Sequence, residues 1–559
     1  MNRIWKVWPW FAAVVSGLLY AGCFPPFDQA WLGWIALTPL IAAIWFSGGN
    51  SKRRWLRNLL LGYVTGLVFF WTVLSWLTTV TAPGWFLLQF YMGSYLALWG
   101  WFCGLMRPRE TSTEIAPNKW EQMLARDGKA PSAPTPVWLR STSNLGVAFL
   151  LAVGWVAQEW LRSWMLTGWG WNGLGVALHK NWLIIQIAEY TGVIGLSFVL
   201  AFANTIVVTT TRRIILEARV RPMRPHWDLN FTVLGLMALL VFGWRVAHTP
   251  RTTRVLRVAA VQADIPRAEK FNRQFTQRIF DEFTDLSENA LRSQAPPELL
   301  VWPESSMPGP VLSDEITNRF VMEFSAATKA DLLLGTLDQD GDRVYNAAIL
   351  VSDGGQKTQL YRKLHLVPFG EYIPLRHAVP LFAQLVGDQV PGDFDVGKDY
   401  TVFRLTNTEV VVAPLICFED TIGELNRRFV LPSNGNPGAN LLVNVTNDGW
   451  FLRSAQSHQH LANAIFRCVE TRRPMIRSAN TGVTCFVNEL GRVTQILQDD
   501  TGSTFTQGTL TGEVNVPVDR QLTFYVRHGE LFAKVCAGLT TLVIVVRFLR
   551  RPKQATIRD

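Results

Sequence analysis

Eight apolar stretches constrain this chain more than any other feature of its sequence. Seven lie in the first 250 residues and one lies near the C-terminus, each close to the ~20 residues that an α-helix needs to cross a bilayer. We expect spans at roughly 7–23, 30–47, 58–78, 84–106, 144–162, 191–211, 229–247 and 529–549. Such a pattern predicts a polytopic helical bundle, in which backbone polar groups are satisfied within each helix.

The composition agrees with a membrane-embedded protein. Only 17% of the 559 residues are charged and 49% are hydrophobic. The 24 Trp and 33 Phe favour the interface between lipid and water. A net charge of +10 could indicate a nucleic-acid partner, but the basic residues gather in the connections between apolar stretches. We therefore expect no nucleic acid.

Lysine and arginine are divided unequally between the two sides of the predicted bundle. One side, which includes both termini, carries 22 of them, whereas the short connections on the other side carry only Arg162 and Lys180. Basic connections stay in the cytoplasm. Both termini are therefore predicted to be cytoplasmic, and an odd number of spans before residue 250 places the following segment outside.

The first apolar stretch could also be a signal peptide. Leu19-Tyr-Ala-Gly-Cys23 has the form of a lipoprotein cleavage site. The tyrosine fits such a site poorly, and the next span begins almost at once, so we interpret the stretch as an uncleaved first span. The six cysteines include no Cys-x-x-Cys pair, which indicates neither a zinc site nor a disulfide framework.

The chain divides into four parts by composition. Residues 1–250 form the seven-span region, which includes a polar, proline-containing cytoplasmic loop at 107–143. Residues 254–520 alternate buried strand-like runs with helix-length segments, which predicts an α/β domain whose sheet is covered by helices. The eighth span at 529–549 and a basic tail at 550–559 complete the chain.

Three reactive side chains follow predicted strands of the α/β domain. Cys417 ends the apolar run that begins at Val410, Glu304 ends Leu299–Trp302-Pro, and Lys363 lies in Tyr361-Arg-Lys-Leu-His365. Taken singly, each has a simpler explanation as a buried thiol, a capping carboxylate or a solvated cation. Taken together, they supply a nucleophile, a general base and a cation for an oxyanion.

These three motifs resemble the nitrilase superfamily. Trp302-Pro-Glu-Ser305, Tyr361-Arg-Lys-Leu-His365 and Ile416-Cys-Phe-Glu419 match its Glu–Lys–Cys triad. The resemblance implies an α-β-β-α sandwich, a catalytic role for Glu304, Lys363 and Cys417, and chemistry without a metal or a cofactor.

Nearly the whole chain further resembles the apolipoprotein N-acyltransferase family, in which seven spans precede a nitrilase-like domain and one follows it. The supporting stretches are Val261–Pro266, His365–Pro374, Asn447–Phe451, Gln459–Pro474 and Arg477–Val483. This likeness implies a bacterial inner-membrane enzyme with an extracytoplasmic catalytic domain. It would transfer an acyl chain from a phospholipid, through a cysteine thioester, to the α-amino group of a diacylglyceryl apolipoprotein.

The resemblance also implies supporting residues around the triad. Glu371 and Glu419 would orient Lys363 or the incoming amine, with structural ion pairing as the alternative, and the backbone N–H of Phe418 would assist the oxyanion. The residues expected to bind substrate or lipid are Phe271, Asn346, Trp450, Trp169 and Trp171. Phe271, Phe418 and Gly449 depart from the residues usual in the family, which affects substrate fit more than chemistry.

A tryptophan-rich segment from Glu159 to Asn172 is predicted at the outer end of a span. It is either an interfacial anchor with a Glu159–Arg162 ion pair or the floor of an acyl-chain pocket. Two other functions remain open. A tethered amidase or nitrilase would not need eight spans, and a transporter would leave the triad unused and has no central charges in its spans.

Overall fold

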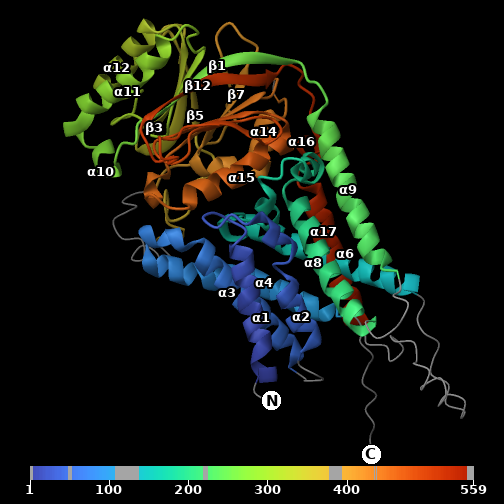
Figure 1. Cartoon of the computed structure of the whole chain (residues 1–559). Coiled ribbons are helices and arrows are strands. Elements are labelled where there is room, and N and C mark those ends of the chain that lie inside the picture. The colour runs from blue at the N-terminus through green and yellow to red at the C-terminus, as the bar shows by residue number, and fades with distance from the viewer. Residues whose placement is uncertain are drawn as a thin grey trace, which may run out of the picture.

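The computed structural model describes residues 4–47, 53–107, 137–217, 225–374, 376, 393–433, 435 and 437–550. Most of the predicted 107–143 loop and of the basic tail at 550–559 lies outside the described residues. Two regions are evident in Figure 1, a group of long helices and, beyond one end of it, a domain built around β-strands.

The helical region is formed by long apolar helices. These are α1 (Ile4–Ala21), α2 (Thr38–Phe46), α3 (Arg54–Val73), α4 (Ala82–Leu105), α6 (Val137–Trp164), α8 (Ile194–Glu217), α9 (Trp227–Ala247) and α17 (Leu531–Leu549). In Figure 1 the start of α1 and the end of α17 both point away from the strands. The short helix α7 (Ala188–Thr191) and several 3₁₀ turns lie on the side that faces the strands.

Every predicted span coincides with helix, but not all are equally long. Within the described residues, five helices are long and apolar enough to cross a membrane, namely α3, α6, α8, α9 and α17. The stretch predicted at 30–47 is a 3₁₀ turn at Ala30–Trp34 followed by the nine-residue α2. The total of eight spans therefore remains a prediction.

Two of the long helices bury little of their surface. Only 6% of the apolar window of α9 and 11% of that of α17 is buried inside the protein. Exposed side chains on α9 include Phe231, Leu234, Val241 and Trp244. Apolar surface of this extent is tolerated in a bilayer and not in water, which agrees with membrane insertion.

Two six-stranded sheets form the second region. The first has the order β12-β1-β2-β3-β4-β5 and the second the order β11-β10-β9-β8-β7-β6. Their bounds are β1 Thr253–Gln262, β2 Leu299–Trp302, β3 Asp331–Asp340, β4 Arg343–Ser352, β5 Lys357–Arg362, β6 Phe403–Arg404, β7 Val411–Ile416, β8 Leu441–Thr446, β9 Met475–Ala479, β10 Cys485–Val487, β11 Val493–Ile496 and β12 Gly508–Pro517. The strands β1, β2 and β3 of the first sheet run parallel, as do β7, β8 and β9 of the second. Of these, β2, β7 and β8 are buried along their whole length, as near-continuous apolar runs predict.

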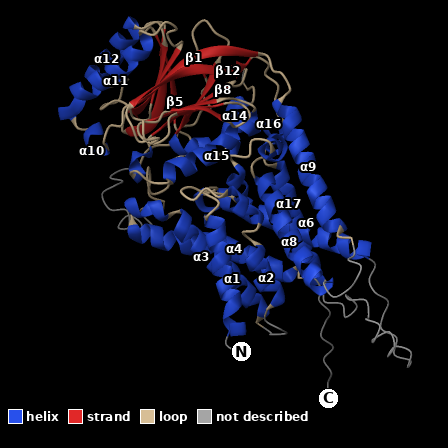
Figure 2. Ribbon diagram, in the orientation of Figure 1, coloured by secondary structure: helices blue, strands red, loops and turns tan. Residues whose placement is uncertain are grey.

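Helices cover the outer face of each sheet. α11 (Thr276–Leu291) and α12 (Glu315–Ala327) pack on the first sheet, while α14 (Gly423–Val430) and α15 (Gln456–Thr471) pack on the second. The predicted α-β-β-α sandwich is confirmed. In Figures 1 and 2, α15 lies between the second sheet and the long helices, so the sandwich rests on the helical region through this layer.

Candidate active site

The predicted nucleophile lies at a sharp turn. β7 is buried along its whole length and ends at Ile416. Cys417 follows with φ +52°, a left-handed conformation that is uncommon for a residue other than glycine. Its carbonyl accepts a hydrogen bond from Asn444 Nδ2 at 2.9 Å. The turn takes Cys417 out of the sheet plane, and it is partly exposed although Ile416 and Phe418 are buried.

Glu304 also follows a buried strand, and its turn depends on a glycine. A Cβ at Gly335 would lie 2.5 Å from the Glu304 Cα, so only glycine allows β3 to pass this close. The Glu304 Oε1 accepts Asn346 Nδ2 at 2.8 Å, whereas Oε2 is buried with no hydrogen-bond partner among the described residues. Burial raises the pKa of Glu304. The carboxylate thus has one oxygen held and one oxygen free to take a proton.

Lys363 follows β5 and is paired with Glu371. Its Nζ lies 2.9 Å from Glu371 Oε1 and 2.8 Å from Oε2. Burial alone would lower the pKa of Lys363, but the carboxylates of Glu371 and Glu304 outweigh it and raise the pKa. The side chain is almost completely buried and remains a cation. A permanent positive charge beside a thiol suits the stabilisation of an oxyanion.

Asn346 joins the two carboxylates. Its Nδ2 donates to Glu304 Oε1 at 2.8 Å and to Glu371 Oε1 at 2.7 Å, and its backbone carbonyl accepts the backbone N–H of Lys363 at 2.8 Å. The sequence predicted Asn346 as a substrate contact. Its contacts instead favour the positioning of both acids and of the lysine.

The side chain of Cys417 is a protonated thiol and not a thiolate. Burial and the neighbouring Glu304 carboxylate raise its pKa, and Lys363 only partly opposes them. A thiol of this kind is protonated at neutral pH and needs a base when it attacks. The free oxygen of Glu304 is suited to that role.

Glu419 ties the nucleophile turn to the first sheet. Oε2 accepts the backbone N–H of Ile416 at 2.9 Å. Oε1 accepts three donors, Tyr361 Oη and the backbone N–H groups of Leu364 and His365, at 2.8, 2.8 and 3.0 Å. Burial raises the pKa of Glu419 to about 7. The positive charge of Lys363 and these hydrogen-bond donors favour the carboxylate and lower the pKa, but they only partly offset the effect of burial. Because both oxygens are occupied, this geometry favours the structural alternative for Glu419.

A second buried network contacts the nucleophile turn at Asp420, and we predicted no role for its members from the sequence. His460 contacts Asp420 Oδ1 at 2.8 Å and Asp448 Oδ1 at 3.0 Å. Arg477 donates to Asp448 at 3.2 Å and also contacts Asp420. All four side chains are fully buried, so the opposite charges compensate one another in a medium where an isolated charge is costly. His460 and Arg477 lie in stretches that carry the family resemblance, and this was the one indication in the sequence that they contribute to the site.

The tryptophan-rich segment of the helical region reaches the nucleophile turn. Phe418 stacks against Trp169 and Trp171, with ring centroids 5.4 and 6.0 Å apart and interplanar angles of 22° and 11°. Trp169 and Trp171 are thereby placed against the residue that follows Cys417, and their role as the floor of an acyl-chain pocket remains a prediction.

The predicted Glu159–Arg162 ion pair is not what holds this segment. Glu159 Oε1 accepts Trp155 Nε1 at 2.8 Å and the Leu174 N–H at 2.7 Å. Arg162 Nη1 donates to the carbonyl of Trp171 at 2.8 Å. Polar side chains of α6 thus hold the backbone that follows it.

Among the described residues, neither Phe271 nor Trp450 hydrogen-bonds or stacks with Glu304, Lys363 or Cys417. Phe271 is 49% exposed, and the Arg267 guanidinium lies over the Trp450 ring at 3.6 Å. The sequence assigned no role to Lys270, which is buried beside them. Its Nζ donates to the carbonyl of Glu304 at 2.7 Å, and burial lowers its pKa to about 7.

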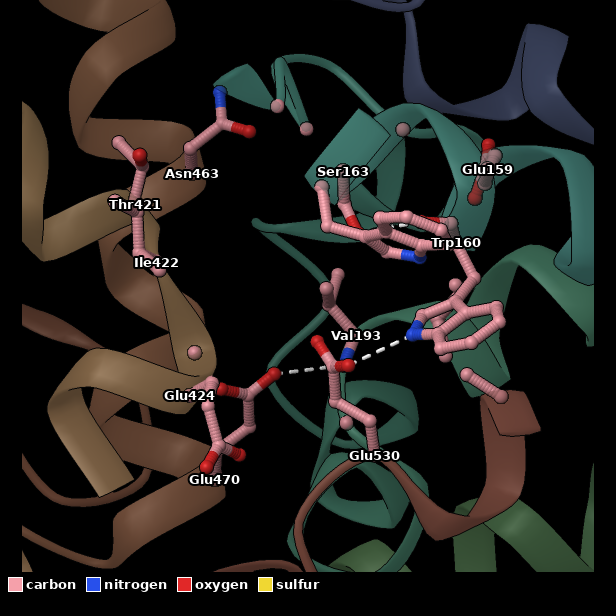
Figure 3. Close-up of a pocket in the computed structure, with 18 of the residues that line it drawn as sticks. Glu159, Trp160, Ser163, Val193, Thr421, Ile422, Glu424, Asn463, Glu470 and Glu530 are labelled. Carbon is pink, nitrogen blue, oxygen red and sulfur yellow. Dashed lines mark hydrogen bonds between the residues drawn. The ribbon is translucent and has the colours of Figure 1, made fainter. Parts of the chain in front are cut away.

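A cavity of about 610 Å³ lies between the sandwich and the ends of α6, α8 and α17 that face it. His365 and Phe418 line it on the nucleophile side. Figure 3 shows Glu470 and Glu530 directed into the same space, with Trp160 Nε1 donating to Glu530. The cavity therefore adjoins both the nucleophile turn and the ends of the membrane helices.

Comparison with known proteins identifies both regions. The profile described as the apolipoprotein N-acyltransferase N-terminal domain matches residues 16–206, and the carbon-nitrogen hydrolase profile matches residues 257–521. Apolipoprotein N-acyltransferase of Geobacter metallireducens is 31% identical over 549 residues, which cover 96% of this chain and 95% of that protein.

The chain belongs to the apolipoprotein N-acyltransferase family.

The chain is also similar to a further relative and to a solved structure. Apolipoprotein N-acyltransferase of Methylococcus capsulatus is 27% identical over 97% of this chain and 96% of its own. A CN-hydrolase superfamily protein from Xanthomonas campestris is 15% identical, covering 47% of this chain and 91% of its own with a TM-score of 0.36. The assignment rests on the sequence matches. The protein is a membrane acyltransferase with a nitrilase-like catalytic domain.

Proposed function

We propose that this enzyme takes an acyl chain from a membrane phospholipid onto Cys417 and passes it to the α-amino group of a diacylglyceryl-cysteine at the N-terminus of an apolipoprotein. The observation that carries the proposal is the stacking of Phe418 on Trp169 and Trp171. It puts the residue next to the thiol in contact with the membrane region, where both proposed lipid substrates lie.

In the first half-reaction, Glu304 Oε2 takes the proton of the Cys417 thiol. The sulfur attacks the ester carbonyl carbon and forms a tetrahedral oxyanion, which the Lys363 ammonium and the backbone N–H of Phe418 stabilise. The carbon–oxygen ester bond then breaks. The leaving alkoxide takes the proton back from Glu304 and departs as a lysophospholipid, leaving a thioester.

In the second half-reaction, the neutral amine of the acceptor attacks the thioester carbonyl. The carbon–sulfur bond breaks, one amine proton passes through Glu304 to the sulfur, and an amide forms. Glu371 and Asn346 hold Lys363 and Glu304 in place throughout. Positioning of this kind matters because a displacement of about 1 Å can cost ~10²-fold in rate.

The proposal includes the location and the orientation of the protein. The catalytic domain lies on the periplasmic face of a bacterial inner membrane, and both termini are cytoplasmic. The distribution of Lys and Arg supports this, as does the common direction of the ends of α1 and α17 (Figure 1).

The two alternatives fit the contacts less well. A tethered amidase would need only the sandwich, whereas here the nucleophile turn is packed on the membrane region. A transporter would not need a buried Glu304–Asn346–Glu371–Lys363 cluster beside a thiol.

The test is the mass of the intact protein after incubation with phospholipid alone. We expect one added acyl chain, its removal by hydroxylamine, and its transfer when a diacylglyceryl-cysteine peptide is supplied. A control protein with Cys417→Ala should gain no mass. If the wild-type protein gains no acyl mass but hydrolyses a soluble amide, the amidase alternative is correct.

A further inference from the structure

α15 is buried on both sides. Every residue of α15 (Gln456–Thr471) is buried except His458, which is partly exposed. One side faces the second sheet and the other faces the long helices (Figure 2). A helix that is buried all round transmits the position of one neighbour to the other.

Among the described residues, the side chain of Gln459 on this helix hydrogen-bonds only to the membrane region. Its Oε1 accepts three N–H donors, and its Nε2 donates to two backbone carbonyls. The donors are Trp76 Nε1, Trp171 Nε1 and Asn172 Nδ2, each at 3.0 Å, and the acceptors are the carbonyls of Pro25 at 2.7 Å and Val73 at 3.1 Å.

These five contacts use the full capacity of the amide. A glutamine side chain has two N–H donors and one carbonyl oxygen, and here both ends are occupied by the membrane region. Indole N–H groups can only donate and backbone carbonyls can only accept, so the orientation of the amide is defined. The partners come from the turn after α1, the end of α3, the turn after it and the segment after α6.

The next residue on the same helix contacts the nucleophile turn. His460 binds Asp420, which lies three residues after Cys417 in the 3₁₀ turn Cys417–Thr421. Its ring also lies 5.5 Å from that of Trp171, a partner of Gln459. Two adjacent residues therefore link four membrane segments to the turn that carries the thiol.

We propose that Gln459 is a positioning residue that fixes the nucleophile turn over the membrane region, so that a lipid ester held by the membrane helices meets Cys417. This inference rests on the proposed acyl transfer from phospholipid. It assigns Gln459 no contact with the reacting atoms. Its loss is expected to displace the thiol relative to a bilayer substrate without altering the triad.

The test compares two acyl donors that react with the same thiol in the full-length protein. A long-chain phospholipid in nanodiscs must be presented by the membrane region, whereas p-nitrophenyl acetate reaches the thiol from water. Intact mass reports acylation of Cys417 by each. Gln459→Met keeps the length of the side chain but removes all five hydrogen bonds. Gln359→Met, on β5 and bonded only to Arg404, is the matched control.

For Gln459→Met we expect acylation by phospholipid to fall ~10-fold or more, the scale of a misplaced reactant, with acetylation within about two-fold of wild type. Gln359→Met should change neither. Trp76→Phe, which removes one N–H and keeps an aromatic ring, should reproduce the selective loss to a smaller degree. It also serves if Gln459→Met does not fold.

Three outcomes would overturn the inference. Equal loss with both donors would mean that Gln459 supports the triad itself. No loss with either would mean that the hydrogen bonds do not position the turn. If the wild-type protein accepts acetate but never the phospholipid chain, the proposed function fails, and this inference fails with it.

Discussion

Trp169 stacks on Phe418 with ring centroids 5.4 Å apart, which brings a side chain of the membrane region against the residue next to the nucleophile. The two residues are separated by about 250 positions in the chain. Through this contact, the segment that follows α6 packs against the turn that carries the thiol. This contact supports a role for the membrane helices beyond anchoring.

Trp169→Ala is expected to slow thioester formation from phospholipid by ~10-fold or more, because Phe418 loses the ring that holds it. The protein should still fold, since Trp169 is only partly buried. Intact mass over time measures the rate. Trp31→Ala, at an exposed tryptophan of the same region, is the control. An isolated 254–520 domain with full activity would contradict a role for the membrane wall.

Replacement of each triad member should impair acyl transfer in its own way. Cys417→Ser should lose turnover, because a hydroxyl has a far higher pKa than a thiol. Glu304→Gln should nearly abolish thioester formation. Lys363→Met should slow both half-reactions by ~10²–10³, which is typical for the loss of one oxyanion donor. Peptide mapping locates the acyl group, and its appearance on Cys468 or Cys485 would mean that Cys417 is not the nucleophile.

The pH dependence of thioester formation should report Glu304. Burial raises its pKa and the Glu371 carboxylate raises it further, while Lys363 lowers it. The rate should therefore rise with pH as Glu304 ionises. Glu371→Gln removes a negative neighbour, so the acid limb should move to lower pH. Rapid-quench measurement of acylation between pH 4 and pH 8 tests the direction, and a shift to higher pH would contradict this account of the charges.

Glu419→Gln should act on stability before chemistry. The glutamine side chain would carry an NH₂ group where Glu419 now has an acceptor oxygen. The buried N–H or O–H groups that donate to that oxygen would then lose their acceptor. A loss of about 1–3 kcal/mol is expected from one such group. Thermal unfolding in detergent measures it, with Glu371→Gln as the comparison. Unchanged unfolding with abolished acyl transfer would instead support a direct role for Glu419.

The orientation of the chain can be tested by labelling single introduced cysteines with an impermeant maleimide in whole cells, in a background that lacks reactive native thiols. Positions near 51, 125 and 555 should be protected until the membrane is opened, whereas position 340 should react from outside once the outer membrane is permeable. Cytoplasmic protection at 340 would contradict both the topology and the proposed acceptor.

Much of the architecture could be predicted from the sequence because it depends on local patterns. Runs of about 20 apolar residues indicated the membrane region, and buried strands that end in Glu304, Lys363 and Cys417 indicated the catalytic sheet edges. The shape of the stretch at 30–47 could not be predicted, because hydropathy does not show that a 3₁₀ turn interrupts the helix.

The sequence by itself determined the two-part organisation and predicted the Glu304–Lys363–Cys417 triad, because apolar length and strand-end residues are encoded within short windows. Only the tertiary structure decided the environment of these residues. It placed Asn346 between two carboxylates, occupied both oxygens of Glu419, and joined Gln459 to four membrane segments. Such contacts join residues that are far apart in the chain, and buried polar groups select partners by geometry and unsatisfied hydrogen bonds, which spacing along a sequence does not record.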